Sequence, residues 1–161
     1  MNRAMSQVLF APSEEASTGV ITVFLAGTTT KVDKIDWRDT VTNSLLGLPI
    51  TIYNPHRPDW DSSWQEDISY PPFRNQVLWE LDKQEKADIV VFYFHPATTA
   101  MVSLLEFGLS ARAPGKSIVV CPEGYCKRGN VQLVCEKFGV QMVEKMETIQ
   151  QLVRSRVLAS G

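Results

Sequence analysis

Two acidic residues in predicted helices hold positions from which side-chain chemistry could occur. Glu106 lies in a helix that we predict over about residues 100–112. The apolar stripe of this helix, read at helical spacing, consists of Val102, Leu105, Leu109 and Ala113. Glu106 falls on that stripe, and a carboxylate that faces a core is costly unless it is paired or used in a reaction. The alternative is that Glu106 lies at the edge of the stripe and reaches water.

Glu80 is a second acidic residue predicted to face inward. It lies in the preceding helix, predicted from Pro71 to about Lys86. The inward face of this helix is predicted to consist of Phe73, Val77, Leu81 and Gln84. Glu80 follows Phe73 by seven residues, which is about two helical turns, so it lands on the same side. The sequence thus directs two carboxylates toward one interior.

The elements that position these helices alternate between strand and helix. Predicted strands cover residues 20–26, 49–53, 88–94, 116–121 and 139–143, and predicted helices cover residues 34–46, 71–86, 100–112, 131–138 and 145–157. Strict alternation is typical of a doubly wound sheet, so we predict an α/β fold with five parallel strands in a flavodoxin-like or Rossmann-like three-layer sandwich. The strand over residues 88–94 is almost wholly apolar, which indicates a central position, and the Glu106 helix follows its carboxyl end.

A glycine and three threonines follow the first predicted strand. Gly27 and Thr28 begin this turn, which offers backbone N–H groups and hydroxyls at the sheet edge where open sheets bind ligands. The turn matches neither the dinucleotide-binding glycine motif nor a P-loop, so neither ligand is indicated. The alternative is a plain connecting turn.

The segment after the second predicted strand is unusually long and aromatic for a connection. It carries Asn54, Arg57, Trp60 and Trp64. Long structured loops are usually functional, and tryptophans argue against disorder. Planar aromatics beside hydrogen-bonding groups suit a flat heterocycle or a sugar as ligand. The alternative is a satellite cluster in which the tryptophans fasten the loop to the domain.

Composition and charge exclude several classes of protein. The chain has 161 residues, of which 44% are hydrophobic and 21% charged, which is typical of a single globular domain. We predict a loose N-terminal arm over residues 1–18 and one α/β domain over residues 19–161. The net charge of −2 and the lack of a long apolar run argue against a nucleic-acid polymer or a membrane as partner. The three cysteines, Cys121, Cys126 and Cys135, match no zinc pattern and predict reduced thiols in the cytoplasm.

Six segments together resemble the nucleoside 2-deoxyribosyltransferase family, and in particular its deoxyribosyltransferase-like branch. They occur in order between about residues 20 and 143, at positions 24–28, 53–64, 76–82, 87–94, 103–108 and 121–130. The last four include the sequences around Glu80, around the third predicted strand, around Glu106 and around Asn130. Each segment alone is a weak signal, whereas six in order indicate both the fold and the family.

The resemblance implies a reaction and a role for several residues. Enzymes of the family move a 2-deoxyribosyl group between nucleobases through a glycosyl ester on a glutamate, which matches Glu106. Glu80 matches the position of the acid that protonates the departing base, where the family has an aspartate. Gly27 and Thr28 match the turn that lines the pocket, and Asn130 matches an asparagine near the 5′ end of the sugar. The resemblance further implies nucleoside or nucleotide and free nucleobase as ligands, no cofactor, no metal, and a homo-oligomer with a shared active site.

The loop before Glu106 departs from the family pattern. Well-studied members carry an aspartate near the 5′-hydroxyl group, but here Thr98, Thr99 and Ser103 offer hydroxyls instead. Loss of that negative charge removes a repulsion against phosphate, so we predict either a 5′-monophosphate, held by hydroxyls, backbone N–H groups and Arg57 or Arg128, or an unusual nucleoside-like glycoside as substrate.

Three functions remain open from the sequence. The first is transfer of deoxyribose between bases. The second is hydrolysis of nucleosides or their 5′-monophosphates through the same ester intermediate. The third is a non-catalytic module that binds a nucleotide or a partner, against which the inward Glu80 and Glu106 argue.

Overall fold

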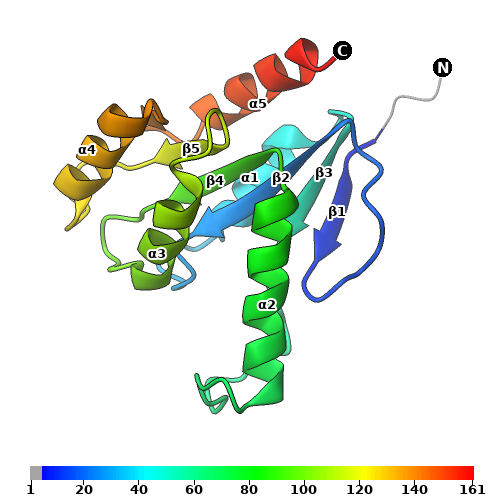
Figure 1. Ribbon diagram of the computed structural model, residues 1–161, viewed down its shortest axis with the longest axis vertical. Helices are drawn as coiled ribbons and strands as arrows, with labels where there is room; N and C mark the ends of the chain where they lie inside the picture. The colour runs from blue at the N-terminus through cyan, green and yellow to red at the C-terminus, as the bar shows by residue number, and fades with distance from the viewer. Residues whose placement is uncertain (1–4) are drawn as a thin grey trace.

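A parallel β-sheet forms the centre of the protein, with helices on both of its faces (Figure 1). The structure, a computed structural model, describes residues 5–161. Its strands are β1 (Gln7–Phe10), β2 (Ile21–Gly27), β3 (Ile50–Asn54), β4 (Ile89–Tyr93), β5 (Ser117–Val120) and β6 (Gln141–Val143). They lie in the order β1-β3-β2-β4-β5-β6, and all neighbouring pairs are parallel. The predicted α/β fold is confirmed, with six strands in place of five.

The helices divide into two layers that cover separate cores. They are α1 (Trp37–Leu45), α2 (Pro71–Lys86), α3 (Met101–Ser110), α4 (Arg128–Phe138) and α5 (Thr148–Ala159). Helices α1 and α5 pack on one face over aliphatic side chains such as Val41 and Ile149. Helices α2, α3 and α4 pack on the other face, where Trp79 and Phe107 join a more aromatic core. The strands alternate between these cores because successive side chains of a strand point to opposite faces.

The additional strand, β1, lies in the segment that we expected to be a loose arm. Leu9 of β1 is buried and pairs in register with Tyr53 of β3. The residue before this strand is held by backbone groups far along the chain, since the Ser6 hydroxyl donates to the Leu45 and Leu48 carbonyls at 3.1 and 2.8 Å. Four residues with long-range partners carry almost no periodic signal, which is why the sequence did not reveal the strand.

Strands β2 and β4 are neighbours at the centre of the sheet, where the strand order changes direction. Open α/β sheets bind their ligands at the carboxyl ends of the strands at such a point. Gly27 ends β2 at a φ of +118°, and a Cβ there would lie 2.4 Å from the backbone nitrogen of Tyr93 in β4. A glycine is therefore required where the two strand ends approach each other.

The inner face of α3 differs from the predicted one. The residues predicted as an inward stripe, Val102, Leu105, Leu109 and Ala113, are all exposed. The buried residues of the helix are Ser103, Glu106, Phe107 and Ser110. Glu106 is thus inward, but on a largely polar face that the hydrophobic pattern does not mark. The prediction of the stripe was wrong because it assumed that the apolar side of the helix faces the core.

Helix α2 also buries a different set of side chains than predicted. Gln84 is buried as expected, but Leu81 is exposed, and Phe73 and Val77 are only half-buried. The buried residues of α2 are Gln76, Trp79, Lys83 and Gln84. Glu80 is half-buried on the same side as Gln76 and Gln84. Among the helices of residues 5–161, none is long and apolar enough to cross a membrane.

Candidate active site

A pair of carboxylates occupies the interior between α2 and α3. Glu106 is 9% exposed. Burial, together with the negative charge of nearby Glu80, raises the pKa of Glu106 to about 7. Burial also raises the pKa of Glu80, against the effects of a hydrogen bond from Gln76 and of the charge of Arg38. Two such groups titrate together, so the pair carries a proton near neutral pH and can present one ionised and one protonated carboxyl group.

Two glutamines on one stripe of α2 hold the carboxylates in place. Gln76 lies four residues before Glu80, and its Nε2 donates to Glu80 Oε1 at 2.8 Å and to the carbonyl of Pro55 at 3.0 Å. Gln84 lies four residues after Glu80, and its Nε2 donates to Glu106 Oε2. Glu106 Oε1 has no hydrogen-bond partner among the described residues, so this oxygen is free to meet a ligand.

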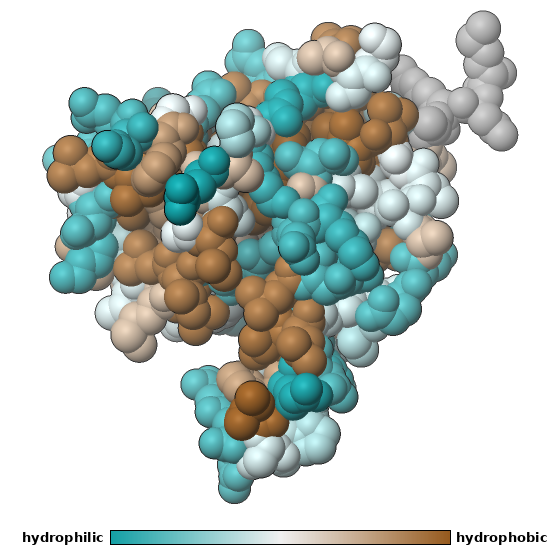
Figure 2. Space-filling model, viewed as in Figure 1, coloured by the Kyte–Doolittle hydropathy of each residue, from teal (hydrophilic) through white to brown (hydrophobic). Residues whose placement is uncertain are grey.

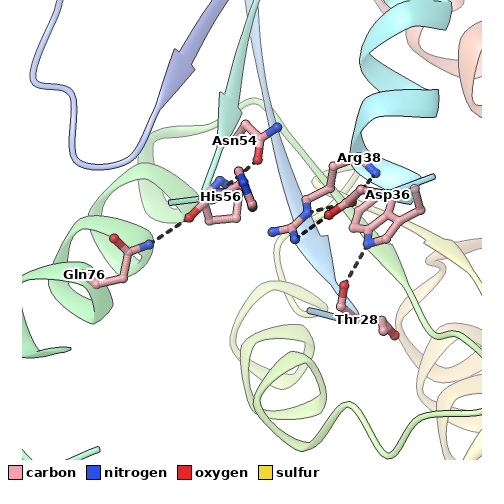
Figure 3. A network of polar contacts seen from close by, with 8 residues as sticks. Thr28, Asp36, Arg38, Asn54, His56 and Gln76 are labelled. Atoms are coloured by element: carbon pink, nitrogen blue, oxygen red, sulfur yellow. Dashed lines mark hydrogen bonds and ion pairs between the residues drawn. The ribbon is translucent and has the colours of Figure 1, made fainter. Parts of the chain in front are cut away.

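A buried arginine that sequence reasoning missed lies near the pair. Arg38 is 6% exposed, and its Nε and Nη2 donate to the Asp36 carboxylate at 3.2 and 3.0 Å. Figure 3 shows this ion pair beside Asn54, His56 and Gln76 at the carboxyl ends of the strands. Burial acts to raise the pKa of Asp36, but its bonds to Arg38 hold that pKa below the usual range. The only sequence signal was a cation two residues after an N-cap aspartate.

The predicted residues Thr28 and Thr98 meet at the switch point. Their Oγ1 atoms lie 2.9 Å apart, and the backbone N–H of His95 donates to Thr28 Oγ1 at 3.0 Å. The indole of Trp37 donates to the Thr28 carbonyl at 2.8 Å. These bonds join the turn after β2 to the loop that leads into α3. The predicted residue Ser103 lies buried on the inner face of α3, on the same side as Glu106.

The aromatic loop after β3 is held together by its own side chains. Arg57 binds Asp59 through two hydrogen bonds of 3.0 and 2.6 Å and lies 5.0 Å from the ring centroid of Trp64. The rings of Trp60 and Trp64 are 4.8 Å apart. Asn54 is buried, and its Oδ1 accepts from the N–H of His56 at 3.0 Å, which forms a turn. These contacts join residues of the loop to one another, so its aromatic rings and its arginine form one cluster.

The segment between β5 and α4 is tied to the start of α3. The Tyr125 hydroxyl donates to the Thr99 carbonyl at 2.8 Å. Arg128 donates to Glu144 at 2.6 Å and to the Cys121 carbonyl at 3.3 Å, so its charge is engaged within the fold. The predicted residue Asn130 is exposed in the first turn of α4.

Two clefts lie near the switch point, and neither is lined by Glu80 or Glu106. The smaller one follows the turn from Thr28 to Trp37 and reaches His95. The larger one has a volume of about 680 Å³ and lies between α1 and the start of α5. Tyr93 at the end of β4 lines both clefts. The clefts therefore mark the edge where ligands of open sheets bind, while the carboxylate pair lies on the α2 and α3 side of it.

Comparison with known families agrees with this geometry. A family model described as nucleoside 2-deoxyribosyltransferase like matches residues 20–125, which is more than half of the chain. The chain belongs to this family. A search among curated proteins gives no match. Membership of the deoxyribosyltransferase-like family supports an activity related to glycosyl transfer or N-glycosidic cleavage, with small nucleoside-type molecules as substrates.

The family match covers the site but not the whole fold. Within the deoxyribosyltransferase-like span of residues 20–125 lie the Thr28 turn, the aromatic loop, Glu80 and Glu106. Strand β1 and Asn130 lie outside it.

Thiols and groups of metal-binding side chains are the remaining features to consider within residues 5–161. Burial raises the pKa of both Cys121 and Cys135 to about 11, so these two side chains are neutral thiols. Cys126 is exposed, and all three cysteines are free. No group of three histidine, cysteine or acidic side chains in residues 5–161 is arranged to hold a metal ion.

Proposed function

We propose that the protein transfers a 2-deoxyribosyl group between nucleobases through a covalent ester on Glu106. The arrangement of one pair of carboxylates carries the proposal. Glu106 and Glu80 face one interior, where burial raises the pKa of both. Oε1 of Glu106 accepts no hydrogen bond within the described chain. Cleavage of a glycosidic bond needs one carboxylate for the sugar and one carboxylic acid for the leaving group.

In the first step the Glu106 carboxylate attacks C1′ of a deoxynucleoside. The C1′–O bond forms as the C1′–N bond breaks, and the bonding electrons leave with the base. Glu80 gives its proton to the departing base nitrogen, which leaves neutral. The transition state resembles an oxocarbenium ion, and the nearby negative charge stabilises it. Gln84, which donates to Oε2 of Glu106, keeps the other oxygen directed at the sugar.

In the second step a new base attacks C1′ and releases Glu106 as a carboxylate. Glu80 takes the proton from the attacking nitrogen, so the enzyme returns to its starting state. Water can take the place of the base, and the reaction is then hydrolysis. Glu106 is 9% exposed, which limits the access of water to the ester and favours transfer.

For the 5′ end of the sugar, neutral hydroxyls are the available partners. Thr98 lies on the loop before α3, with its Oγ1 2.9 Å from that of Thr28, and Ser103 lies buried on α3, the helix that carries Glu106. Arg57 and Arg128 are both engaged by carboxylates of the chain. We therefore propose that hydroxyl groups recognise the 5′ group. Comparing cleavage of a deoxynucleoside with that of its 5′-monophosphate tests this, and a strong preference for the monophosphate would contradict it.

The test of the reaction is incubation with a deoxynucleoside and a second free base, followed by chromatography. A new nucleoside is the expected product. Free base alone would mean hydrolysis, and no change over days would mean a binding module without catalysis. Glu80→Gln should lower the rate by about 10²- to 10⁴-fold, most for poor leaving groups. Mass spectrometry of the denatured Glu80→Gln protein should find one deoxyribosyl group on the peptide that contains Glu106.

A further inference from the structure

Arg38 is more deeply buried than the acid with which it pairs. The side chain of Arg38 is 7% exposed, whereas that of Asp36 is 28% exposed. An arginine in the first turn of a surface helix normally extends into water, because taking a cation out of water is costly. Here the cation is turned inward and its partner lies nearer to the surface. This arrangement places a positive charge at the carboxyl ends of the strands, where the site lies.

The ion pair with Asp36 leaves one side of the guanidinium without a partner. Nε and Nη2 donate to the two oxygens of Asp36, which also accepts from the Arg38 backbone N–H at 2.9 Å. Nη1 donates to no group within residues 5–161. In that part of the chain, the enclosed side-chain atoms without a partner are Thr42 Oγ1, Gln76 Oε1 and Ser117 Oγ. Nη1 is not one of them, so it opens onto accessible space. In Figure 3 the unpaired side of the guanidinium faces away from Asp36, toward His56 and Gln76.

The charge of Arg38 acts on the Glu80 end of the carboxylate pair. Burial has the largest effect on the pKa of Glu80 and raises it, while the hydrogen bond from Gln76 and the charge of Arg38 lower it. The pKa of Glu106 depends instead on burial, on Glu80 and on Gln84. Gln76, toward which the guanidinium faces, is also the residue that donates to Glu80. Arg38 thus lies on the side where the proposed reaction places the departing base.

Helices α2 and α3 offer no cation for this position in the described chain. Helix α3 presents apolar side chains outward (Figure 2), and its only charged residue is Glu106. On α2, Lys83 and Lys86 contact acidic side chains, and Arg74 is exposed. Arg38, at the start of α1, therefore supplies the positive charge beside the acid.

We propose that Arg38 binds the leaving nucleobase, with Nη1 donating to the acceptor atom beside the glycosidic nitrogen. This atom is the O2 carbonyl oxygen of a pyrimidine or N3 of a purine. The inference rests on the proposed function, since that reaction assigns the base to the Glu80 end. As the C1′–N bond breaks, its electron pair spreads from the nitrogen onto the acceptor, so the hydrogen bond strengthens in the transition state. The ion pair with Asp36 holds the guanidinium in place beforehand.

A fixed cation at this position also selects among bases. It favours neutral bases that carry a carbonyl oxygen or a ring nitrogen next to the glycosidic nitrogen. It disfavours bases that are positively charged in the bound nucleoside, because like charges would then meet in a buried site. The substrate class is therefore the ordinary pyrimidine or purine deoxynucleosides.

The first test measures binding and needs no turnover. Glu106→Gln protein is titrated calorimetrically with each of the four natural deoxynucleosides, and the tightest ligand is kept. Adding Arg38→Gln should weaken its binding by about 10-fold, as expected for a hydrogen bond from a charged donor. The matched control is Arg154→Gln, an exposed arginine of α5, which should leave the affinity unchanged. Circular dichroism checks folding. Arg38→Lys replaces Arg38→Gln if the latter does not fold, because a lysine that pairs with Asp36 has no second arm for the base.

The second test separates catalysis from support of α1. With Glu106 intact, Arg38→Gln should lower kcat by about 10²-fold, more than it weakens binding, because the charge on the base develops only in the transition state. Asp36→Asn removes the ion pair but retains an oxygen that can cap the helix, so it should lower kcat by less than about 10-fold.

Several results would overturn the assignment of Arg38. One is an Arg38→Gln protein with unchanged affinity and kcat. Another is an equal loss in Arg38→Gln and Asp36→Asn, which would mean that the arginine only supports α1. A loss confined to 5′-monophosphates would assign the cation to phosphate. Binding that depends on Arg38 without any cleavage would refute the reaction and leave the base site standing, whereas cleavage that does not need Arg38 would do the reverse. Failure of all four deoxynucleosides to bind would overturn both.

Discussion

Helices α3 and α5 lie on opposite faces of the sheet and distribute their side chains in opposite ways. In α5 the aliphatic residues Ile149 and Val153 are fully buried, and polar residues such as Arg154 face the solvent. In α3 a carboxylate and two serines are turned inward, and Leu105 is exposed. Both helices occupy similar positions in the architecture, so packing against a sheet does not explain the difference.

Both faces of α3 thus differ from those of α5. An inward carboxylate raises the free energy of the folded state, and the proposed reaction gives this cost a purpose. An outward leucine stripe leaves apolar side chains in water, where α5 has mostly polar ones. Helix α5 meets the ordinary demands of a core, whereas α3 buries polar groups and exposes apolar ones. Substitutions in the two helices test this contrast.

The largest expected effect is on turnover at the inner face of α3. Glu106→Gln should lower the rate of base exchange by about 10⁴-fold or more, because the amide cannot form the ester. The change preserves shape, and the new amide oxygen can still accept from Gln84. The matched control is Glu136→Gln on the exposed side of α4, outside both clefts, which should retain wild-type rates. Chromatography of the reaction mixture measures both, and wild-type rates in Glu106→Gln would refute the role of nucleophile.

The next effect is on the free energy of unfolding, and here we expect the larger change in α5 and the smaller one in α3. Ile149→Ala in α5 should lower the free energy of unfolding by about 2–5 kcal/mol, because it leaves a cavity in a closed core. Leu105→Ala in α3 should change it by no more than about 0.5 kcal/mol in the single chain. Urea unfolding at high dilution, where chains are separate, measures both. Equal losses would mean that Leu105 packs within its own chain, which contradicts its exposure.

A pH effect should distinguish the inward carboxylate. The pKa of Glu106 is raised from its usual 4.5 to about 7 beside Glu80, so the folded protein holds one proton on this pair up to about pH 7, and stability should fall as pH rises through this range. The shift from 4.5 to about 7 corresponds to about 3 kcal/mol, present in full below pH 4.5 and lost above pH 7. Glu106→Gln should therefore exceed the wild type in stability at pH 8 but not at pH 4.5. Urea unfolding at both pH values tests this, and a constant difference would contradict it.

The smallest expected effect lies where α3 begins. Ala100 precedes the helix with a φ of 44° and a ψ of 46°, a left-handed conformation that costs a residue with a Cβ about 1 kcal/mol. Ala100→Gly should raise the free energy of unfolding by about 0.5 kcal/mol once the greater freedom of the unfolded chain is subtracted. Ala159→Gly at the end of α5 should lower it instead, since its φ is not positive. Thermal unfolding of both variants gives the signs, and a loss in both would contradict the prediction.

Periodicity predicted the alternating elements well and the faces of two helices poorly. Strand β4 shows an uninterrupted apolar run because both of its faces are covered, so its central place could be predicted. The stripe of α3 led to the wrong face, because hydrophobic patterning assumes that the apolar side of a helix faces the core, and here that side is exposed. Strand β1 was missed because its partners are far along the chain.

The candidate site was predictable in part, and for a related reason. Glu106, Glu80 and Thr28 lie in segments whose residue types and order resemble a family. Arg38 and Gln84 lie in ordinary helical sequence, where an arginine or a glutamine normally faces water. Their burial depends on carboxylates contributed by distant segments, which only the folded chain brings together.

The stripe of Gln76, Glu80 and Gln84 makes the spacing within α2 decide how both carboxylates are held. The three residues lie at intervals of four, so one helix places an amide group beside each of the two carboxylates. Inserting a single residue between Glu80 and Gln84 would turn the downstream amide by about 100° about the helix axis. Glu106 would then lose its hydrogen bond from Gln84, while Glu80 would keep its hydrogen bond from Gln76. The positions of these residues along the helix, and not only their types, therefore determine which carboxylate is hydrogen-bonded.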